Sequence, residues 1–372
     1  MSRLHRSASS RMSRPAISIQ SGGGWTFGSP SVLMMFYRAP GELESELAEM
    51  DECMPHYYRV TNCHGQGAET IMRAEALFYQ GHVTDAHIEL ERAYAQVGGN
   101  GQINMALCCD FLSWRLSLHT DVERRYTFSE RYAALLRYHD ASWINIWSAT
   151  SAYYHALRGE TDKIPEIFSQ HRLSDIHLLA PGKPMMEMIE NQVYLAQGAY
   201  AKVVGRSAEL LAACEAMHYA LVALHIRIQT AAAYARLGKP ETAHAWLQKA
   251  LSDAGPDGLV MPFAENYSIL KPLLARETRS AFAARITALG EAAQARGAER
   301  LRPAAFRALT AREFEIVELM AQRLSNREIA QKCYLSEGSV KQYVNQIYSK
   351  LHIEGDTRTK RAQLAALLHE KT

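Results

Sequence analysis

The chain has 372 residues, which is too long for one typical domain, so two or more are expected. Apolar residues make up 48% of it, enough for a substantial core, and the formal net charge of +2 excludes a polyelectrolyte. Any nucleic-acid binding must therefore come from a local patch of charge.

The first 40 residues are rich in Gly, Ser and Pro, and we predict an N-terminal segment, residues 1–40, that is partly disordered. Its longest apolar run, residues 32–37, is too short to span a bilayer, and residues 1–14 lack the apolar stretch of a secretory signal. The glycines of residues 22–28 have no lysine placed to reach a phosphate, and no phosphate-binding-loop motif occurs elsewhere. These features predict a cytoplasmic protein without membrane contact and without a bound cofactor.

Glycines recur through the middle of the chain at Gly81, Gly159, Gly198 and Gly238, separated by 78, 39 and 40 residues. Because 78 is twice 39, the spacing predicts a further turn, without glycine, near His119. Each glycine lies between two amphipathic stretches, and a small or aliphatic residue follows five positions later: Ala86, Ile164, Val203 or Ala243. Helix-turn-helix pairs at a fixed period are typical of an α-solenoid, here with about five units, and an irregular helical bundle is the alternative.

This pattern resembles tetratricopeptide repeats, which have aromatic and Ala positions in the first helix, Gly at the turn, and Ala near the end of the second helix. Ala93 and Ala250 occupy that last position. The period is longer than is usual for the family. We therefore predict an all-α chain in which residues 41–300 form a tetratricopeptide-like sensor or interaction domain.

Candidate ligand-binding and catalytic residues in this region have simpler readings as structural residues. A solenoid pocket would be concave, and its aromatic candidates are Trp114, Trp143, Trp147, Tyr153 and Tyr154, but aromatics at helical spacing are more often core. Acids such as Glu187 and Glu190 are read as solvated, and the six cysteines as buried free thiols. No metal-binding or catalytic motif accompanies the fifteen histidines, and we predict no enzymatic activity.

Turn and linker signals separate this region from the rest of the chain. Residues 255–258 (GPDG) end the last clear repeat, and a helical stretch at residues 279–296 would cap it. Residues 297–303 then read as a short linker into a final domain, residues 303–369.

Within this domain, the stretch from Leu309 to Leu368 reads as three short helices. Asn326 is the predicted N-cap of the second helix, in which Ile329, Ala330 and Cys333 are spaced for packing. Tyr334 and Leu335 close a turn, and Ser336 caps the third helix. Helix, tight turn and capped helix is the order of a helix-turn-helix.

The third helix, from about residue 337 to 351, has two chemically distinct stripes. The apolar stripe consists of Val340, Tyr343, Val344, Ile347, Tyr348 and Leu351, and the opposite stripe of Lys341, Gln342, Asn345 and Ser349. Cationic and amide side chains bond phosphates and base edges in the major groove, so this stripe is a candidate DNA-reading surface. A small bundle with a merely solvated face is the alternative.

Four short motifs in this domain resemble the DNA-binding domain of LuxR-type transcriptional regulators. They are Leu309-Thr310-x-Arg312-Glu313, Ser325-Asn326-x-Glu328-Ile329-Ala330, Ser336-x-x-Ser339-Val340-Lys341 and Ile347-Tyr348-x-Lys350-Leu351. The resemblance implies that Lys341, Gln342 and Asn345 face the groove and that Ser339 and Lys350 lie near phosphates. We also predict Ser336 as a DNA-binding residue. Tyr343, where the family often has His, and Gly338 depart from its pattern.

A solenoid followed by such a reader is similar to the C-terminal half of the maltose-activator group of large ATP-binding LuxR-type regulators. This resemblance implies a sequence-specific transcriptional regulator whose solenoid senses an unknown small-molecule or protein effector and gates the reader. Its predicted partners are double-stranded DNA, bound as a homodimer, and RNA polymerase as a further candidate. The alternative is a protein-interaction scaffold with a degenerate, non-specific DNA-binding domain.

Overall fold

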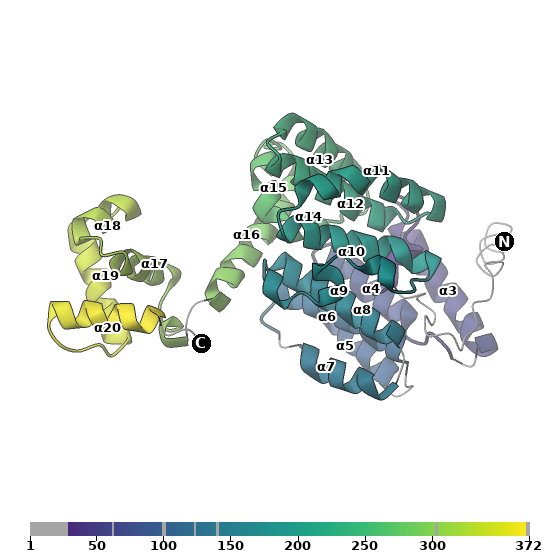
Figure 1. The fold of residues 1–372 in the computed structure, drawn as a ribbon, viewed down its shortest axis with the longest axis horizontal. Helices are drawn as coiled ribbons and strands as arrows, with labels where there is room; N and C mark the ends of the chain where they lie inside the picture. The colour runs from purple at the N-terminus through teal and green to yellow at the C-terminus, as the bar shows by residue number, and fades with distance from the viewer. Residues whose placement is uncertain are drawn as a thin grey trace. The chain divides into compact units, whose positions relative to one another are not determined.

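The structure, a computed structural model, describes residues 29–369 except 62, 99–101, 123, 139–140 and 302–303. The described residues form helices and no strand, which confirms the predicted all-α class (Figure 1). The chain divides into two compact units, Met1–Ala293 and Gln294–Thr372, here called the helical unit and the reader unit.

The helices of the first unit follow the chain in the order α2 (Leu33–Phe36), α3 (Leu43–Thr61), α4 (Ala68–Tyr79), α5 (Val83–Gly98), α6 (Ile103–His119), α7 (Phe128–Leu135), η1 (Leu136–Tyr138), α8 (Ala141–Leu157), η2 (Thr161–Lys163), α9 (Glu166–Ser169), η3 (Leu173–Asp175), η4 (Ala180–Gly182), α10 (Lys183–Ala196), α11 (Tyr200–Met217), α12 (Ala220–Arg236), α13 (Pro240–Ala254), α14 (Met261–Glu265), α15 (Tyr267–Leu274) and α16 (Ala281–Leu301), whose residues from Gln294 on are counted with the second unit.

These helices alternate between an inner and an outer layer. The inner helices α4, α6, α8, α10 and α12 pack against one another in turn and are buried on most sides. The outer helices bury one stripe each; α13, for example, buries only Ala243, Leu247, Ala250 and Ala254. That spacing is one face of an amphipathic helix, so the outer layer covers the inner one.

The recurring glycines form the turns between inner and outer helices. Gly81, Gly159, Gly198 and Gly238 have φ values of 83°, 69°, 77° and 71°, the left-handed region that glycine enters without a steric penalty. Three of the four connect consecutive long helices, α4 to α5, α10 to α11 and α12 to α13. The predicted turn without glycine is also present, since α6 ends at His119.

The described residues before α3, from Ser29 on, lie inside the helical unit. Val32, Leu33 and Met34 are fully buried, and α2 packs against α4 and α12. The backbone N–H of Leu33 donates to Glu75 Oε2 at 2.7 Å. The predicted domain boundary at residue 40 therefore does not coincide with a change in packing; residues 1–28, including the glycine cluster, lie outside the described residues.

An ion pair fixes α14 to the inner layer. Arg115 of α6 donates from Nε to Glu265 Oε1 at 2.7 Å and from Nη1 to the Tyr79 hydroxyl at 2.8 Å. The rings of Phe78 and Phe111 lie 4.7 and 5.1 Å from its guanidinium carbon. Because both charges are buried and mutually bonded, neither is left uncompensated in the core.

The predicted linker at residues 297–303 is wrong for most of its length, because α16 continues to Leu301. A single glycine in a helix costs only about 1 kcal/mol relative to alanine, so Gly297 does not end the helix.

In the described part of the reader unit, four helices follow a short 3-10 turn, where three were predicted. They are η5 (Ala304–Phe306), α17 (Ala311–Ala321), α18 (Asn326–Cys333), α19 (Glu337–Lys350) and α20 (Thr357–His369). Asp356 Oδ1 accepts the Thr359 N–H at 2.7 Å and starts the unpredicted α20, and Leu364 then joins the core. The other residues in the core of the reader unit include Phe306, Ile316, Val317, Ile329, Val340 and Ile347.

Candidate nucleic-acid interface

Side-chain caps fix the N-termini of the reader helices, as Asp356 does for α20 and the capping box of Thr310 and Glu313 does for α17. Ser336 caps α19 as predicted, with its Oγ accepting the Ser339 N–H at 3.0 Å. The predicted cap of α18, Asn326, is wrong: Ser325 is the cap, and its N–H donates to Glu328 Oε2 at 2.7 Å while its Oγ accepts the Glu328 N–H at 3.3 Å. This reciprocal pair is a capping box, which satisfies two backbone donors at once.

The turn between α18 and α19 is tight and exposes an aromatic ring. Tyr334 ends α18 with φ of 54°, and the Leu335 N–H donates to the Ala330 carbonyl at 2.9 Å. Tyr334 is 96% exposed, so its ring packs on nothing in the described chain. The sequence predicts only a turn here. An exposed aromatic two residues before the N-cap of α19 is a further candidate contact residue, and its only sequence signal is its position.

The two predicted stripes of α19 are confirmed. Val340, Ile347 and Tyr348 are buried against α17 and α18, and Tyr343, Val344 and Leu351 are half-buried around them. The opposite face carries Lys341, Gln342, Asn345 and Ser349, all exposed. The helix therefore presents a continuous polar face whose first residues follow the cap directly, which is the part of a recognition helix that contacts base edges.

The structure brings most of the predicted contact residues together at the start of α19. Ser336 and Ser339 have hydroxyl oxygens 2.9 Å apart, and Lys341, Gln342 and Asn345 lie within the next two turns. No described group forms an ion pair with Lys341, so its ammonium is available to an incoming base or phosphate.

Lys350 lies apart from this group, at the end of α19. Its Nζ donates to Glu313 Oε2 at 2.8 Å, and the Glu313 side chain is only 3% exposed. Burial raises the pKa of Glu313, but the Lys350 ammonium and the Thr310 N–H outweigh burial, and the net shift is downward. Lys350 thus holds α19 to the capping box of α17.

In the helical unit, the predicted aromatic candidates are mainly core residues. Trp114, Tyr153 and Tyr154 are buried, and Trp143 and Trp147 are half-buried against the same core. A groove of about 490 Å³ lies elsewhere, between the segment 171–178, α10 and α11. Within the described residues no group of three or more His, Cys, Asp or Glu could hold a metal ion, and no helix is long and apolar enough to cross a membrane.

The prediction of buried free thiols holds for four of the six cysteines. Cys108, Cys109, Cys214 and Cys333 are buried, whereas Cys63 is exposed and Cys53 half-buried. Burial raises the pKa of the adjacent Cys108 and Cys109 well above its usual range. This pair lacks the reactive thiolate that a redox sensor requires.

Comparison with known proteins assigns the reader unit. Residues 307–362 match the family described as bacterial regulatory proteins, luxR family. A stretch of 50 residues is 44% identical to the transcriptional regulatory protein LnrK of Bacillus subtilis, covering 13% of this chain and 23% of LnrK. The chain thus matches less than a quarter of that protein's length. No solved structure gives a significant match. The C-terminal part of the chain is a LuxR-type helix-turn-helix domain, the DNA-binding domain of a family of transcriptional regulators.

Proposed function

We propose that this protein is a sequence-specific transcriptional regulator that reads double-stranded DNA with the exposed face of α19. The observation that carries the proposal is the group Lys341, Gln342 and Asn345, exposed on one face and opposite the buried Val340 and Ile347. An amide side chain pairs with adenine through two hydrogen bonds, and a lysine bonds the O6 and N7 acceptors of guanine. These are the side chains that such reading requires.

Phosphate contacts would come from the start of the same helix. The hydroxyls of Ser336 and Ser339 and the positive end of the α19 dipole can bond a phosphate oxygen. Lys350 would have to leave Glu313 to bind a phosphate with its full charge, so we propose a smaller share of the affinity for Lys350 than for Lys341.

The same proposal includes the assembly on DNA. Helix-turn-helix proteins read half-sites one helical turn or a multiple apart, and a two-fold operator requires two reader units. We therefore propose a homodimer on DNA, acting on transcription with RNA polymerase as a candidate partner. The site of action is cytoplasmic, and no catalytic step is included.

We further propose that the helical unit is a tetratricopeptide-like solenoid that senses an effector and gates the reader. The support is its two helical layers, the repeated left-handed glycines such as Gly81 and Gly238, and the groove beside α10 and α11. The buried helices α2 and α14 pack against α4 and α12 of the inner layer and occupy the space beside them. We therefore place the effector in the groove beside α10 and α11 and not against the inner layer.

Selection of duplexes from a randomised pool by the full chain tests the proposal. The expected result is enrichment of one sequence as two half-sites separated by a helical turn or a multiple of it. Retention of duplexes without any enriched sequence, at a salt-sensitive affinity, would instead support a scaffold with a non-specific DNA-binding domain.

A further inference from the structure

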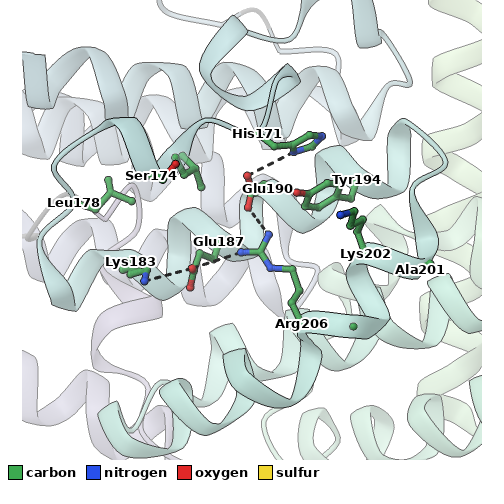
Figure 2. Close-up of a pocket in the computed structure, with 12 residues that line it drawn as sticks. His171, Ser174, Leu178, Lys183, Glu187, Glu190, Tyr194, Ala201, Lys202 and Arg206 are labelled. Carbon is green, nitrogen blue, oxygen red and sulfur yellow. Dashed lines mark hydrogen bonds and ion pairs between the residues drawn. The ribbon is translucent and has the colours of Figure 1, made fainter.

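The groove between α10 and α11 has an aromatic and aliphatic wall. The imidazole of His171 stacks flat on the ring of Tyr194, with centroids 3.8 Å apart and an angle of 8° between the planes. Leu173 also lines the groove, and Leu178 lines it from the segment before α10 (Figure 2). With about 490 Å³, the groove has the size of sites that hold small organic ligands.

One end of the groove carries Glu187, a carboxylate with two ion-pair partners, neither of which bonds it at normal hydrogen-bond distance. Glu187 Oε1 lies 3.5 Å from Arg206 Nη2 and 3.8 Å from Lys183 Nζ, both longer than a normal charged hydrogen bond. By contrast, Glu190 is bonded directly by Arg206 and lies 3.5 Å from His171 Nδ1. Glu187 is therefore the acceptor that an incoming ammonium would find.

The other end of the groove suits a carboxylate. Lys202 is exposed in the first turn of α11, and no described carboxylate pairs with it. The small residues Ala201 and Gly205 of α11 also line the groove, beside the positive end of the α11 helix dipole. Figure 2 shows Lys202 and Lys183 on opposite sides of the groove, with Arg206 between them.

The distance between the two ends selects the ligand. The three-residue turn at 197–199 makes α10 and α11 antiparallel, and Arg206 lies opposite Glu190. Glu187 is three residues from Glu190 in one direction, and Lys202 is four residues from Arg206 in the other. At 1.5 Å per residue the two ends lie roughly 10 Å apart along the helices.

An extended peptide spans about 3.3–3.6 Å per residue, so about three residues cover that distance, and a free amino acid does not. We propose that this groove binds a short peptide of about three residues with free termini, its ammonium on Glu187 and its carboxylate at Lys202 and the start of α11. Its side chains would lie along His171 and Leu178. The role of this peptide as effector of the reader rests on the proposed function, whereas its binding in the groove does not.

Equilibrium dialysis of the full chain against a mixed library of tripeptides tests the binding itself. We expect a subset of tripeptides with free termini to be retained, and the same library with acetylated and amidated ends to pass through, as should single amino acids. Equal retention of the blocked library, or retention of no tripeptide at millimolar concentration, would overturn the proposal.

Calorimetry with the best-retained tripeptide then locates the site. Glu187→Gln and Lys202→Gln should each weaken binding roughly ten- to a hundredfold, the loss of one charged hydrogen bond. The matched controls are Glu215→Gln, exposed in the last turn of α11, and Lys239→Gln, exposed in the turn before α13, and both should bind normally. Thermal melts that match the wild type exclude misfolding, and unchanged affinity in both groove variants refutes this site.

Titration of the DNA complex with the same tripeptide separates the two proposals. A shift in DNA affinity that Glu187→Gln abolishes supports the peptide as effector. Calorimetric binding without any shift overturns the effector role but leaves the groove as a peptide site. Absence of DNA binding contradicts the proposed function alone, because the calorimetric result stands without it.

Discussion

Replacing Lys350 with methionine should destabilise the reader unit rather than weaken its contact with DNA. The change removes the ammonium 2.8 Å from Glu313 Oε2 and leaves a carboxylate that is only 3% exposed with one donor fewer. A hydrogen bond to a charged group contributes about 1.5–3 kcal/mol, and the Lys350 side chain is 40% exposed, so we expect a loss of about 1–2 kcal/mol.

The loss should depend on pH in a defined direction. The pKa of Glu313 is raised by burial but lowered more by Lys350 and Thr310, so the net value is below the ordinary 4.5. A lowered carboxyl pKa stabilises the fold fully above pH 4.5, and this contribution is lost as the pH falls through the folded-state value. The Lys350→Met variant should therefore differ from the wild type at neutral pH and converge with it in acid.

Hydrogen exchange of the α17 and α19 amides measures this change without contribution from the helical unit. At neutral pH the slowest amides of the variant should exchange about 5–30 times faster, the factor that corresponds to 1–2 kcal/mol. Lys341→Met, on the same helix and exposed, is the control and should change the stability by less than about 0.5 kcal/mol. Equal exchange in the wild type and in Lys350→Met would refute the structural role of this ion pair.

Three further changes test the helical unit. Burial raises the pKa of Glu75 to about 7 from the ordinary 4.5. The contribution of Glu75 to the stability of the fold is therefore complete below pH 4.5 and is lost as the pH rises through 7. Glu75→Gln should remove that loss and raise the free energy of unfolding by up to about 3 kcal/mol at pH 8, as measured by urea unfolding. A Cβ on Gly290 would overlap the ring of Tyr267, so Gly290→Ala should cost about 1–3 kcal/mol in thermal melts, whereas Gly205→Ala, with open space, should not. A thiol reagent should label exposed Cys63 well before buried Cys108, and equal rates would contradict the described burial.

The features that follow from local periodicity were predictable. The 3.6-residue repeat alone places Val340 and Ile347 inside and Lys341 and Asn345 outside, because no distant contact is needed to decide the face. The glycine turns were predictable for a similar reason, since a left-handed residue between two helices is usually glycine.

Features that depend on distant partners were not predictable. Composition predicts a partly disordered segment before residue 40, and in its described part Leu33 is held by a bond to Glu75, 42 positions away. Glu190 looked like a solvated acid because its partner Arg206 lies on another helix.

The cap at Ser325 is a different case. Its signal, a glutamate three residues later, was present in the sequence, and Asn326 was preferred only because it is also a good cap residue. The error therefore lies in the choice between two adjacent cap residues and not in a missing signal.

One measurement tests the central claim most directly. It compares the full chain with its Lys341→Ala variant, at one salt concentration, for affinity to the selected duplex and to a random duplex. If α19 reads base edges, the variant should lose about 1–3 kcal/mol on the selected duplex and much less on the random one. An equal loss on both duplexes would make Lys341 a phosphate contact, and no loss on either would contradict the assignment of this face as the DNA-reading surface.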